Sequence, residues 1–248
     1  MLSGSEYRPT LRALGGPNVL YLNSFTKKLL PALRLGFLVG SPETRATLVS
    51  SKRVSTLANV SIEDVHDRGS YADGTTASEG VTATDVVIRD VHGRGLDQLA
   101  GLGVSLIGGT NVLERVLIER VHECGLCATS DGVDTVSDVV VRDVVDTECS
   151  RTTCPGVGAS VGVGVSDAAH LVARRFRIER VQSVGAQVAG LAGLDLADGL
   201  ISSAPIGVNV QVPSYAFDRL TTLVTFEDVV VPLDAQYLPV PSAGSDAM

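Results

Sequence analysis

Four cysteines are the residues whose type and spacing point most directly to chemistry. They form two pairs, Cys124-Gly-Leu-Cys127 and Cys149-Ser-Arg-Thr-Thr-Cys154. Thiols at these spacings can form disulfides, which suit an exported protein, or bind zinc as a tetrathiolate site, which suits a cytosolic one. We expect disulfides at Cys124, Cys127, Cys149 and Cys154, across a corner of the chain or between its turns. Reduced thiols and a zinc site on the same four residues are the alternatives.

Three of the four histidines, His66, His92 and His122, occupy one position of a repeated segment. Stacked imidazoles can bind a transition metal. Because no carboxylate or fourth ligand stands beside them at metal spacing, we interpret them as turn residues at one corner of a repeat, and we expect no metal there.

Carboxylates recur in the same segment, which first reads Val60-Ser-Ile-Glu-Asp-Val65. Two positions of it carry charges of mixed sign. The first column is Glu63, Arg89, Glu119, Arg142, Glu179, Ser202 and Glu227, and the second is Asp64, Asp90, Arg120, Asp143, Arg180, Ser203 and Asp228. Neighbouring strands lie about 4.8 Å apart, so residues of one column become neighbours. One interpretation is a catalytic carboxylate cluster, as in polysaccharide-cleaving proteins. We favour a salt-bridged ladder that penalises a slipped register.

The repeated segment is the element that must position these side chains. Its central residues are separated by 26, 30, 23, 37, 23 and 25 positions: Ile62, Ile88, Ile118, Val141, Ile178, Ile201 and Phe226. The segment alternates apolar with charged residues, which is the periodicity of a strand. A period of this size is typical of a solenoid, whose repeats bury their apolar faces against one another. We predict a mainly β fold, a single-stranded parallel β-helix of about seven coils, whose last strand ends at Pro232.

Composition excludes several classes of function. The chain has 248 residues and a net charge of −8, which argues against binding the phosphate backbone of nucleic acid. Aromatic residues make up 4% and Trp is absent, so platforms that stack on bases or sugars are scarce. The N-terminus lacks the pattern of a signal peptide, and no apolar run reaches membrane-spanning length. These features predict a cytoplasmic protein without a membrane span.

A change of composition near residue 53 indicates two pieces of different origin. Residues 1–53 carry eight Lys or Arg against two acidic residues, whereas residues 54–248 carry twelve Arg, no Lys and twenty-six acidic residues. We expect a first segment at 1–55, a β-helix at 56–238 and a disordered tail at 239–248. A gene fusion or an artefact of gene calling would explain the junction.

Within the first segment, residues 18–25 and 33–40 read as strands. Ser41-Pro42-Glu43 then predicts the start of a helix that runs to about Arg53. Ser is a common N-cap, Pro suits the first helical position, and a carboxylate suits the first turn.

Between these strands, Ser24-Phe-Thr-Lys27 is followed by Leu33-Arg34-Leu-Gly36. This pattern resembles the cofactor-lysine region of fold-type-I aminotransferases, closest to the aminotransferase-like domains of GntR-type transcription regulators. By that resemblance Lys27 would carry pyridoxal 5'-phosphate, and Ser24 and Arg34 would hold its phosphate. The family's phosphate loop, its stacking aromatic and the Asp that pairs with the pyridine nitrogen are not found. Without that Asp the cofactor cannot act as an electron sink. We therefore expect no cofactor in practice and a vestigial segment that caps one end of the solenoid.

Residues 56–238 resemble the right-handed parallel β-helix repeat proteins of bacterial secretomes. That resemblance is architectural, implies an exported protein and transfers no residue. We predict a non-catalytic structural or interaction protein that recognises a protein or glycan surface. The alternatives are an aminotransferase-like protein that uses pyridoxal phosphate on Lys27, and a carbohydrate-active β-helix, which the scarcity of aromatic residues disfavours.

Overall fold

The structure is a computed structural model, and it describes residues 21–24, 36–39, 56–66, 68–74, 80–93, 101–146 and 159–241. The chain divides into two compact units, Met1–Val54 and Ser55–Met248. This boundary lies within two residues of the composition break at residue 53.

In the first unit the described residues form a two-stranded antiparallel sheet. Strand β1 spans Tyr21–Ser24 and strand β2 spans Gly36–Val39, with Ser24 opposite Gly36. Both strands fall inside the ranges that the sequence predicts. The helix predicted from Ser41 to about Arg53 lies outside the described residues.

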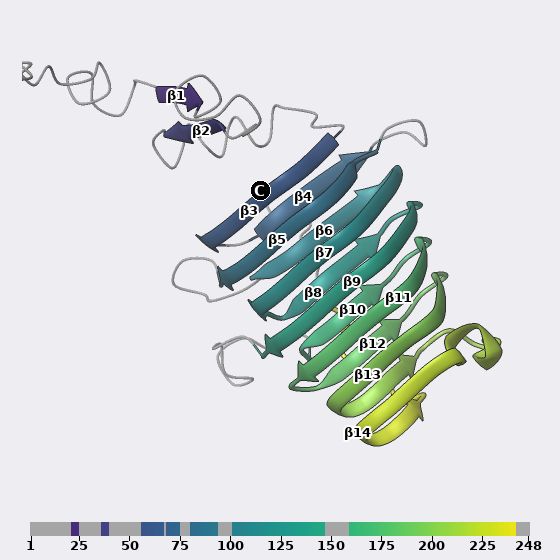
Figure 1. The fold of residues 1–248 in the computed structure, drawn as a ribbon. Coiled ribbons are helices and arrows are strands. Elements are labelled where there is room, and N and C mark those ends of the chain that lie inside the picture. The colour runs from purple at the N-terminus through teal and green to yellow at the C-terminus, as the bar shows by residue number, and fades with distance from the viewer. Residues whose placement is uncertain are drawn as a thin grey trace, which may run out of the picture. The chain divides into compact units, whose positions relative to one another are not determined.

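The second unit consists mainly of parallel strands (Figure 1). They are β3 (Thr56–His66), β4 (Arg68–Gly74), β5 (Thr82–His92), β6 (Leu102–Gly108), β7 (Thr110–His122), β8 (Cys124–Thr129), β9 (Val133–Val145), β10 (Val161–Val165), β11 (His170–Val181), β12 (Val184–Val188), β13 (Gly193–Val210) and β14 (Thr222–Asp234). A short 3-10 helix, η2 (Phe217–Leu220), precedes β14. The mainly β class is confirmed.

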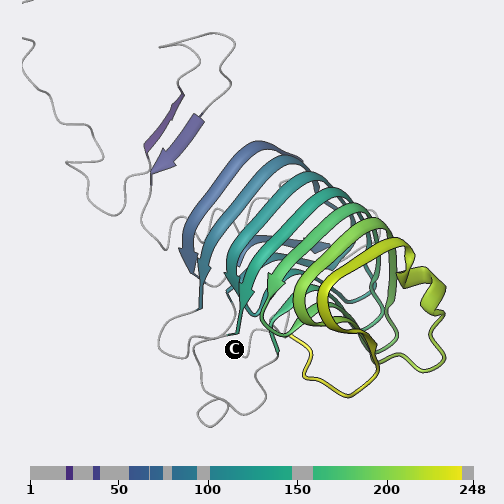
Figure 2. The ribbon, with the colours of Figure 1, turned by 60° about the horizontal axis from the view of Figure 1, so that its bottom comes forward.

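The strands form two rows, and the chain alternates between them. The long row is β3, β5, β7, β9 and β11, and it continues through the first part of β13 and through β14. The short row is β4, β6, β8, β10 and β12, and it continues through the second part of β13. Strand β13 pairs with β11 through its first part and with β12 through its second, and thereby joins the rows into one nearly closed, barrel-like sheet. Figure 2 shows the successive strands stacked in chain order, with β14 last. The repeated segment predicts the long row but not the short one.

The register of the long row follows the repeated segment. The central apolar residues face one another from strand to strand, in the order Ile62, Ile88, Ile118, Val141, Ile178, Ile201 and Phe226. The predicted columns are therefore confirmed. The prediction that Pro232 ends the last strand is wrong, because β14 continues to Asp234. Among the described strands, β14 pairs only with β13, and an edge strand can accommodate a residue that lacks a backbone N–H.

Each strand of the long row bends at two residues with left-handed backbone. Their φ angles lie between 49° and 57°, and they stand five positions apart in each strand. The first corner column is Asn59, Asp85, Arg115, Asp138, Arg175, Asp198 and Leu223. The second corner column is Asp64, Asp90, Arg120, Asp143, Arg180, Ser203 and Asp228. Residues in this conformation interrupt the pleat, so each long strand presents three short faces instead of one flat ribbon.

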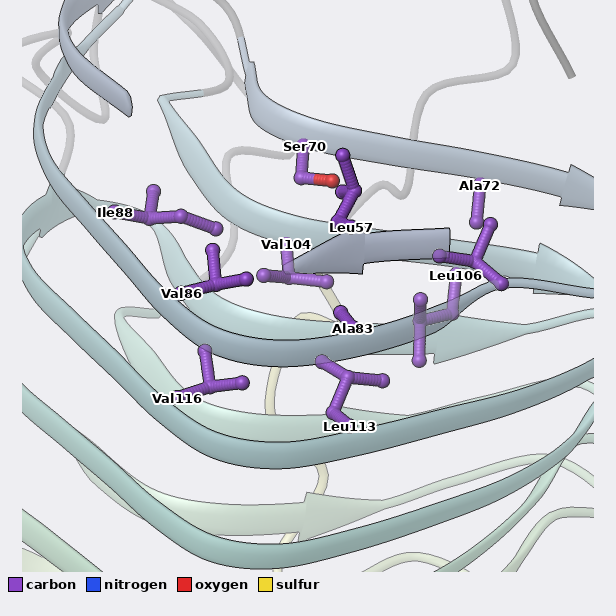
Figure 3. Close-up of a pocket in the computed structure, with 11 residues that line it drawn as sticks. Leu57, Ser70, Ala72, Ala83, Val86, Ile88, Val104, Leu106, Leu113 and Val116 are labelled. Carbon is purple, nitrogen blue, oxygen red and sulfur yellow. The ribbon is translucent and has the colours of Figure 1, made fainter. Parts of the chain in front are cut away.

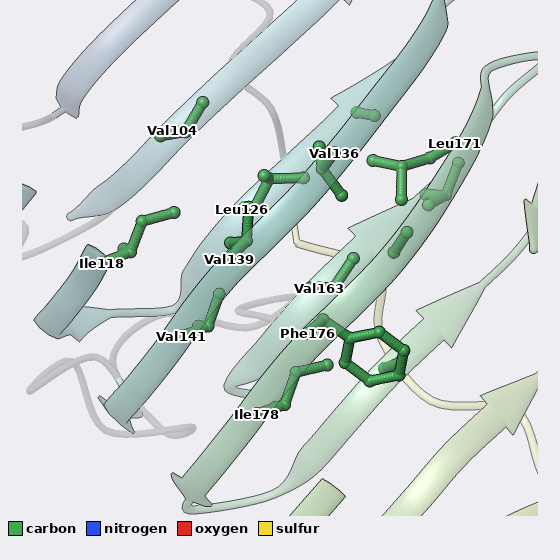
Figure 4. Close-up of a cluster of buried hydrophobic side chains, with 14 of the residues drawn as sticks. Val104, Ile118, Leu126, Val136, Val139, Val141, Val163, Leu171, Phe176 and Ile178 are labelled. Carbon is green, nitrogen blue, oxygen red and sulfur yellow. The ribbon is translucent and has the colours of Figure 1, made fainter. Parts of the chain in front are cut away.

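The core fills the space between the two rows (Figure 4). Ile88, Ile118, Ile178 and Ile201 of the long row are at most 1% exposed. They pack against glycines at the start of the short strands. A Cβ atom on Gly162 would lie 2.5 Å from both Ile178 Cγ2 and the carbonyl oxygen of Gly185. Close approach of these aliphatic side chains to the backbone therefore requires glycine at this position.

Candidate functional site

The long row of the second unit carries a charged outer face. In the first predicted charge column, Arg89 Nε lies 3.3 Å from a carboxylate oxygen of Glu63 and 3.8 Å from one of Glu119. Arg142 Nη2 lies 2.6 Å from the other oxygen of Glu119. From Glu63 to Arg142 the alternating charges therefore form the ladder that the sequence predicts, whereas Glu179 pairs with Arg177 and Arg180 of its own strand.

The two corner columns carry a second set of ion pairs with fork geometry. In the first column Arg115 donates to both oxygens of Asp85, at 2.7 and 3.0 Å, and Arg175 does the same to Asp138, at 2.8 and 2.9 Å. These pairs join strands 30 and 37 residues apart in sequence. This column was not among the predictions made from the sequence. Its signal was the recurrence of Asp and Asn, which tolerate left-handed backbone.

The second corner column repeats the geometry. Arg120 Nε and Nη2 lie 2.7 and 2.9 Å from the carboxylate of Asp90, and Arg180 Nε and Nη2 lie 2.6 and 3.0 Å from that of Asp143. The hydrogen bonds from arginine lower the pKa of both Asp90 and Asp143. These carboxyl groups are therefore ionised acceptors at neutral pH.

Two members of the first charge column are buried: Glu119, which is 4% exposed, and Glu179, which is 9% exposed. Glu119 is the more deeply buried of the two. Burial by itself would raise the pKa of Glu119. Hydrogen bonds from Arg142 and Arg120 outweigh that effect, and the net pKa is lowered. The buried carboxylate is thus held in its charged form between two guanidinium groups.

A shallow hollow of about 330 Å³ lies on this outer face, across β11, β13 and β14. Arg175 and Arg177 border it on β11, Asp198 and Leu200 on β13, and Thr225 on β14. Arg177 Nε donates to Glu179 at 2.7 Å. The hollow is lined by positively and negatively charged groups and by an apolar patch. This lining is better suited to contact the polar surface of a partner than to bind a small apolar ligand.

An interior cavity at the other end of the sheet is too small to bind a ligand (Figure 3). Leu57, Ala83, Val86, Val104 and Leu113 are among its lining residues, and Ser70 is the one polar residue there. Its volume is about 10 Å³. A single water needs roughly that space and two or more polar partners.

The three histidines stand at one corner, as predicted, at the ends of β3, β5 and β7. Ring centroids are 5.4 Å apart for His66 and His92 and 6.1 Å apart for His92 and His122. His66 Nδ1 lies 3.1 Å from the carbonyl oxygen of Gly93, and His92 Nε2 lies 3.7 Å from Asp64. Within the described ranges, no three His, Cys, Asp or Glu side chains are placed to hold a metal ion.

The first cysteine pair is a disulfide inside one strand of the short row. Cys124 and Cys127 of β8 are bonded to each other, with Cα atoms 6.2 Å apart. Both are buried beside Leu102 in a small apolar cluster. A bonded pair offers no thiolate to zinc. Cys149 and Cys154 lie outside the described residues.

A polar cluster that sequence reasoning missed joins β11 and β13 to the segment before β14. Arg219 donates to both oxygens of Asp195, at 2.7 and 2.8 Å, and His170 Nε2 lies 2.7 Å from the same carboxylate. The hydrogen bonds from Arg219 hold the pKa of Asp195 at about 2. No repeat or motif signalled this cluster, because Arg219 lies in a connection that the repeat does not cover.

Tyr215 extends this cluster to the backbone of β13. Its hydroxyl donates to the carbonyl oxygen of Leu194 at 2.6 Å and accepts from the Leu194 N–H at 2.5 Å. The Arg219 guanidinium lies 5.2 Å from the centre of the Tyr215 ring, within the range of a cation–π contact. The cluster therefore fastens the segment that contains η2 onto β13, which is a structural role.

Comparison with known proteins provides no relative for these features. No protein-family model matches the chain, and no curated protein or solved structure matches it either. In the part of the chain that the structure describes, no helix is long and apolar enough to span a membrane. The proposed function therefore depends on the geometry of the described residues.

Of the three candidate cofactor residues in the first unit, the structure describes only Ser24. Ser24 is the last residue of β1, and Lys27 and Arg34 lie outside the described residues. Strands β1 and β2 pair so that Ser24 faces Gly36, which brings the two ends of the intervening segment together. Lys27 and Arg34 both belong to that segment.

Proposed function

We infer that the chain is a non-catalytic structural or interaction protein, built as a parallel β-helix of about seven coils. The shared register of the long row, its two corner columns and the alternation between rows support this architecture. In this proposal the first unit is a vestigial aminotransferase-like segment that serves as an end cap. The buried Cys124–Cys127 disulfide supports export to an oxidising compartment.

The observation that carries the functional proposal is that charged residues on the outer face pair with one another between strands. Asp85, Asp90, Asp138 and Asp143 each accept two hydrogen bonds from one arginine of the next strand, and those bonds lower the pKa of all four. A general acid of a glycoside-cleaving site needs a raised pKa, so that it still holds a proton near neutral pH. The pKa values of these carboxyl groups are lowered instead, so these groups do not hold a proton near neutral pH. They hold strands in register and present a stiff, patterned surface.

The hollow across β11, β13 and β14 is the part of that surface best shaped to contact a partner. Its guanidinium groups, the carboxylate of Asp198 and the hydroxyl of Thr225 can hydrogen-bond a protein or glycan surface. Arg175 is already held by Asp138, so the surface is preorganised and little side-chain entropy is lost on contact.

A pair of ladder substitutions tests the proposal. If Asp138 and Arg175 are structural, Asp138→Asn and Arg175→Gln should lower the urea midpoint of unfolding, and the wild-type chain should release no product from a panel of acidic and neutral polysaccharides. Turnover of any substrate that Asp138→Asn abolishes without a change in the midpoint would overturn the proposal. Asp131→Asn, at an exposed turn, is the matched control for the removal of one carboxylate.

A second candidate function is an aminotransferase-like protein that binds pyridoxal phosphate on Lys27. The sequence pattern Ser24-Phe-Thr-Lys27 followed by Leu33-Arg34-Leu-Gly36 favours it. The described residues supply no contact to the cofactor, and no chemical step is derived through it. Titration of the purified chain with pyridoxal phosphate decides the point. A Schiff-base absorption band that Lys27→Ala removes would support this function, and the same spectrum for both proteins would retire it.

A further inference from the structure

Strand β14 is an edge strand with an unusual exposed surface. It pairs with β13 on one side, and no described strand pairs with its other side. Leu223 and Val230 of β14 are 79% and 82% exposed. The inward residues Val224, Phe226 and Val229 are only partly buried against the core. Apolar side chains and backbone hydrogen-bonding groups are therefore both available along this edge.

The closest carboxylate–arginine pairs between strands of the long row follow one directional rule: a carboxylate on one strand is bound by an arginine of the following strand. The longer contact of Arg89 with Glu119, at 3.8 Å, runs the other way. The rule holds in the first charge column for Glu63 with Arg89 and Glu119 with Arg142. It holds in the second corner column for Asp90 with Arg120 and Asp143 with Arg180.

Glu227 and Asp228 are the last carboxylates of these same two columns. Glu227 pairs in register with Ser202 of β13, and Asp228 has the left-handed backbone of the corner column. Both are exposed, and within the described ranges neither side chain makes a hydrogen bond or an ion pair. By the rule of the preceding strands, they are two acceptors that face an absent pair of arginines.

We propose that the free edge of β14 docks an extended segment of a partner, in parallel, with arginines facing Glu227 and Asp228 and apolar residues on either side of them. This is a form of β-strand addition, in which backbone hydrogen bonds supply affinity and side chains supply selectivity. The inference rests on the proposed function, since it names the surface and the chemistry of a partner for an interaction protein.

A second copy of the chain is the competing occupant, and the charges select against it. Stacking β14 on the β3 strand of another copy in the same register would place Glu227 against Glu63 and Asp228 against Asp64. Like charges directly opposite on adjacent strands are destabilising. The same two carboxylates thus disfavour strand β3 of a second copy and favour a basic strand, so repulsion and attraction both contribute to specificity.

Two peptides based on the chain's own β9 strand test the proposal. The first is Ser-Asp-Val-Val-Val-Arg-Arg-Val-Val, which is residues 137–145 with Asp143→Arg, and the second has Glu at both Arg positions. Fluorescence anisotropy with the full chain should show that the Arg peptide binds about tenfold tighter than the Glu peptide, with affinity that falls as salt is raised. Hydrogen exchange of the wild-type chain should slow at β14 when the Arg peptide is added, and not at β3.

The variant Glu227→Arg/Asp228→Arg should reverse the preference of the two peptides, and Glu227→Gln/Asp228→Asn should reduce it to near equality. Equal binding of both peptides to the wild type, or a preference that survives the charge reversal, would overturn the proposal. Wild-type self-association that the reversal variant abolishes would also overturn it, because the occupant would then be a second copy. If this docking proposal fails, the unfolding experiment with Asp138→Asn and Arg175→Gln is unaffected. A failure of the docking proposal can therefore be told apart from a failure of the proposed structural function.

Discussion

Arg142 on β9 donates two hydrogen bonds, from Nε at 2.8 Å and Nη2 at 2.6 Å, to one carboxylate oxygen of Glu119 on β7. The other oxygen of Glu119 lies 2.8 Å from Nη1 of Arg120. Glu119 is 4% exposed, so its charge depends on these two guanidinium groups for stabilisation instead of on water. The contact ties two strands together at a point where a one-residue slip would leave a buried charge unpaired.

Replacing Glu119 by Gln should therefore lower the free energy of unfolding by about 1–3 kcal/mol, because the bound guanidinium groups lose their ionic partner. Glu63→Gln is the matched control, since Glu63 stands in the same column but is exposed; its change should stay within about 0.5 kcal/mol. The pKa of Glu119 is lowered in the fold, so its contribution exists above its ordinary pKa and is lost as pH falls through the folded value. Urea unfolding at neutral and acid pH measures both effects. Equal costs for the two variants would contradict the role of burial.

Asp134 on β9 should make stability depend on pH in the opposite sense. Its side chain is fully buried, Asn111 Nδ2 donates to its Oδ1 at 2.7 Å, and its Oδ2 has no partner. Burial raises the pKa of Asp134 to about 6. A carboxyl group with a raised folded pKa destabilises the fold once it ionises, so stability should fall as pH rises from about 4 to about 6 and then level off.

The variant Asp134→Asn keeps the acceptor for Asn111 and removes the charge. We expect it to be more stable than the wild type by about 1–2 kcal/mol at pH 7 and to lose that advantage at pH 4, because the wild-type carboxyl is then neutral. Thermal or urea unfolding across this pH range is the measurement. An advantage that is the same at both pH values would show that the charge of Asp134 is not its source.

The repeats allow the strands of the long row to be predicted, but they do not show where each strand bends. Ile88, Ile118 and Ile178 recur with charged neighbours at fixed offsets, so their register can be read from spacing alone. The corner at Arg115 cannot, because arginine has no intrinsic preference for left-handed backbone and is held there by its fork to Asp85.

The burial of Glu119 and the polar cluster around Asp195 could not be predicted from the sequence either. Glu119 and Glu63 occupy the same repeat position, and only the packing of neighbouring strands makes one buried and the other exposed. Asp195 on β13 and Arg219 are 24 residues apart, and Arg219 lies in a connection without a repeat. The short row is hard to recognise in the sequence because its strands of five to seven residues carry glycines that resemble those of loops.

Gly162 and Gly164 on β10 offer a test of the packing between the rows. A Cβ atom on Gly162 would lie 2.5 Å from the carbonyl oxygen of Gly185 and 2.5 Å from Ile178 Cγ2. The backbone oxygen and the Ile178 side chain cannot both move away from it. A Cβ atom on Gly164 would meet Cys127 Sγ at 3.3 Å, a contact that small shifts relieve. We expect Gly162→Ala to cost about 1–3 kcal/mol or more of unfolding free energy, and Gly164→Ala less than about 1 kcal/mol. Urea midpoints of the two variants decide it, and the reverse order would refute the close approach at Gly162.

Arg219 should control the local stability of the segment that contains η2. It holds Asp195 through a fork and lies over Tyr215, whose hydroxyl binds the backbone N–H of Leu194. Arg219→Ala should therefore speed hydrogen exchange at Leu194 by about fivefold, since roughly 1 kcal/mol of local contact is lost. Arg174→Ala, an exposed arginine on β11, is the control and should leave Leu194 unchanged.

The pH dependence of the same exchange identifies Asp195 as the partner. Its pKa in the fold is about 2, below the ordinary value of a carboxyl, so the clamp is complete above about pH 4 and is lost as pH falls toward 2. Protection of Leu194 in the wild type, corrected for intrinsic exchange, should decline over that interval, whereas Arg219→Ala should show no such decline. If both proteins lose protection in parallel, the segment is held by Tyr215 without help from the Arg219–Asp195 pair.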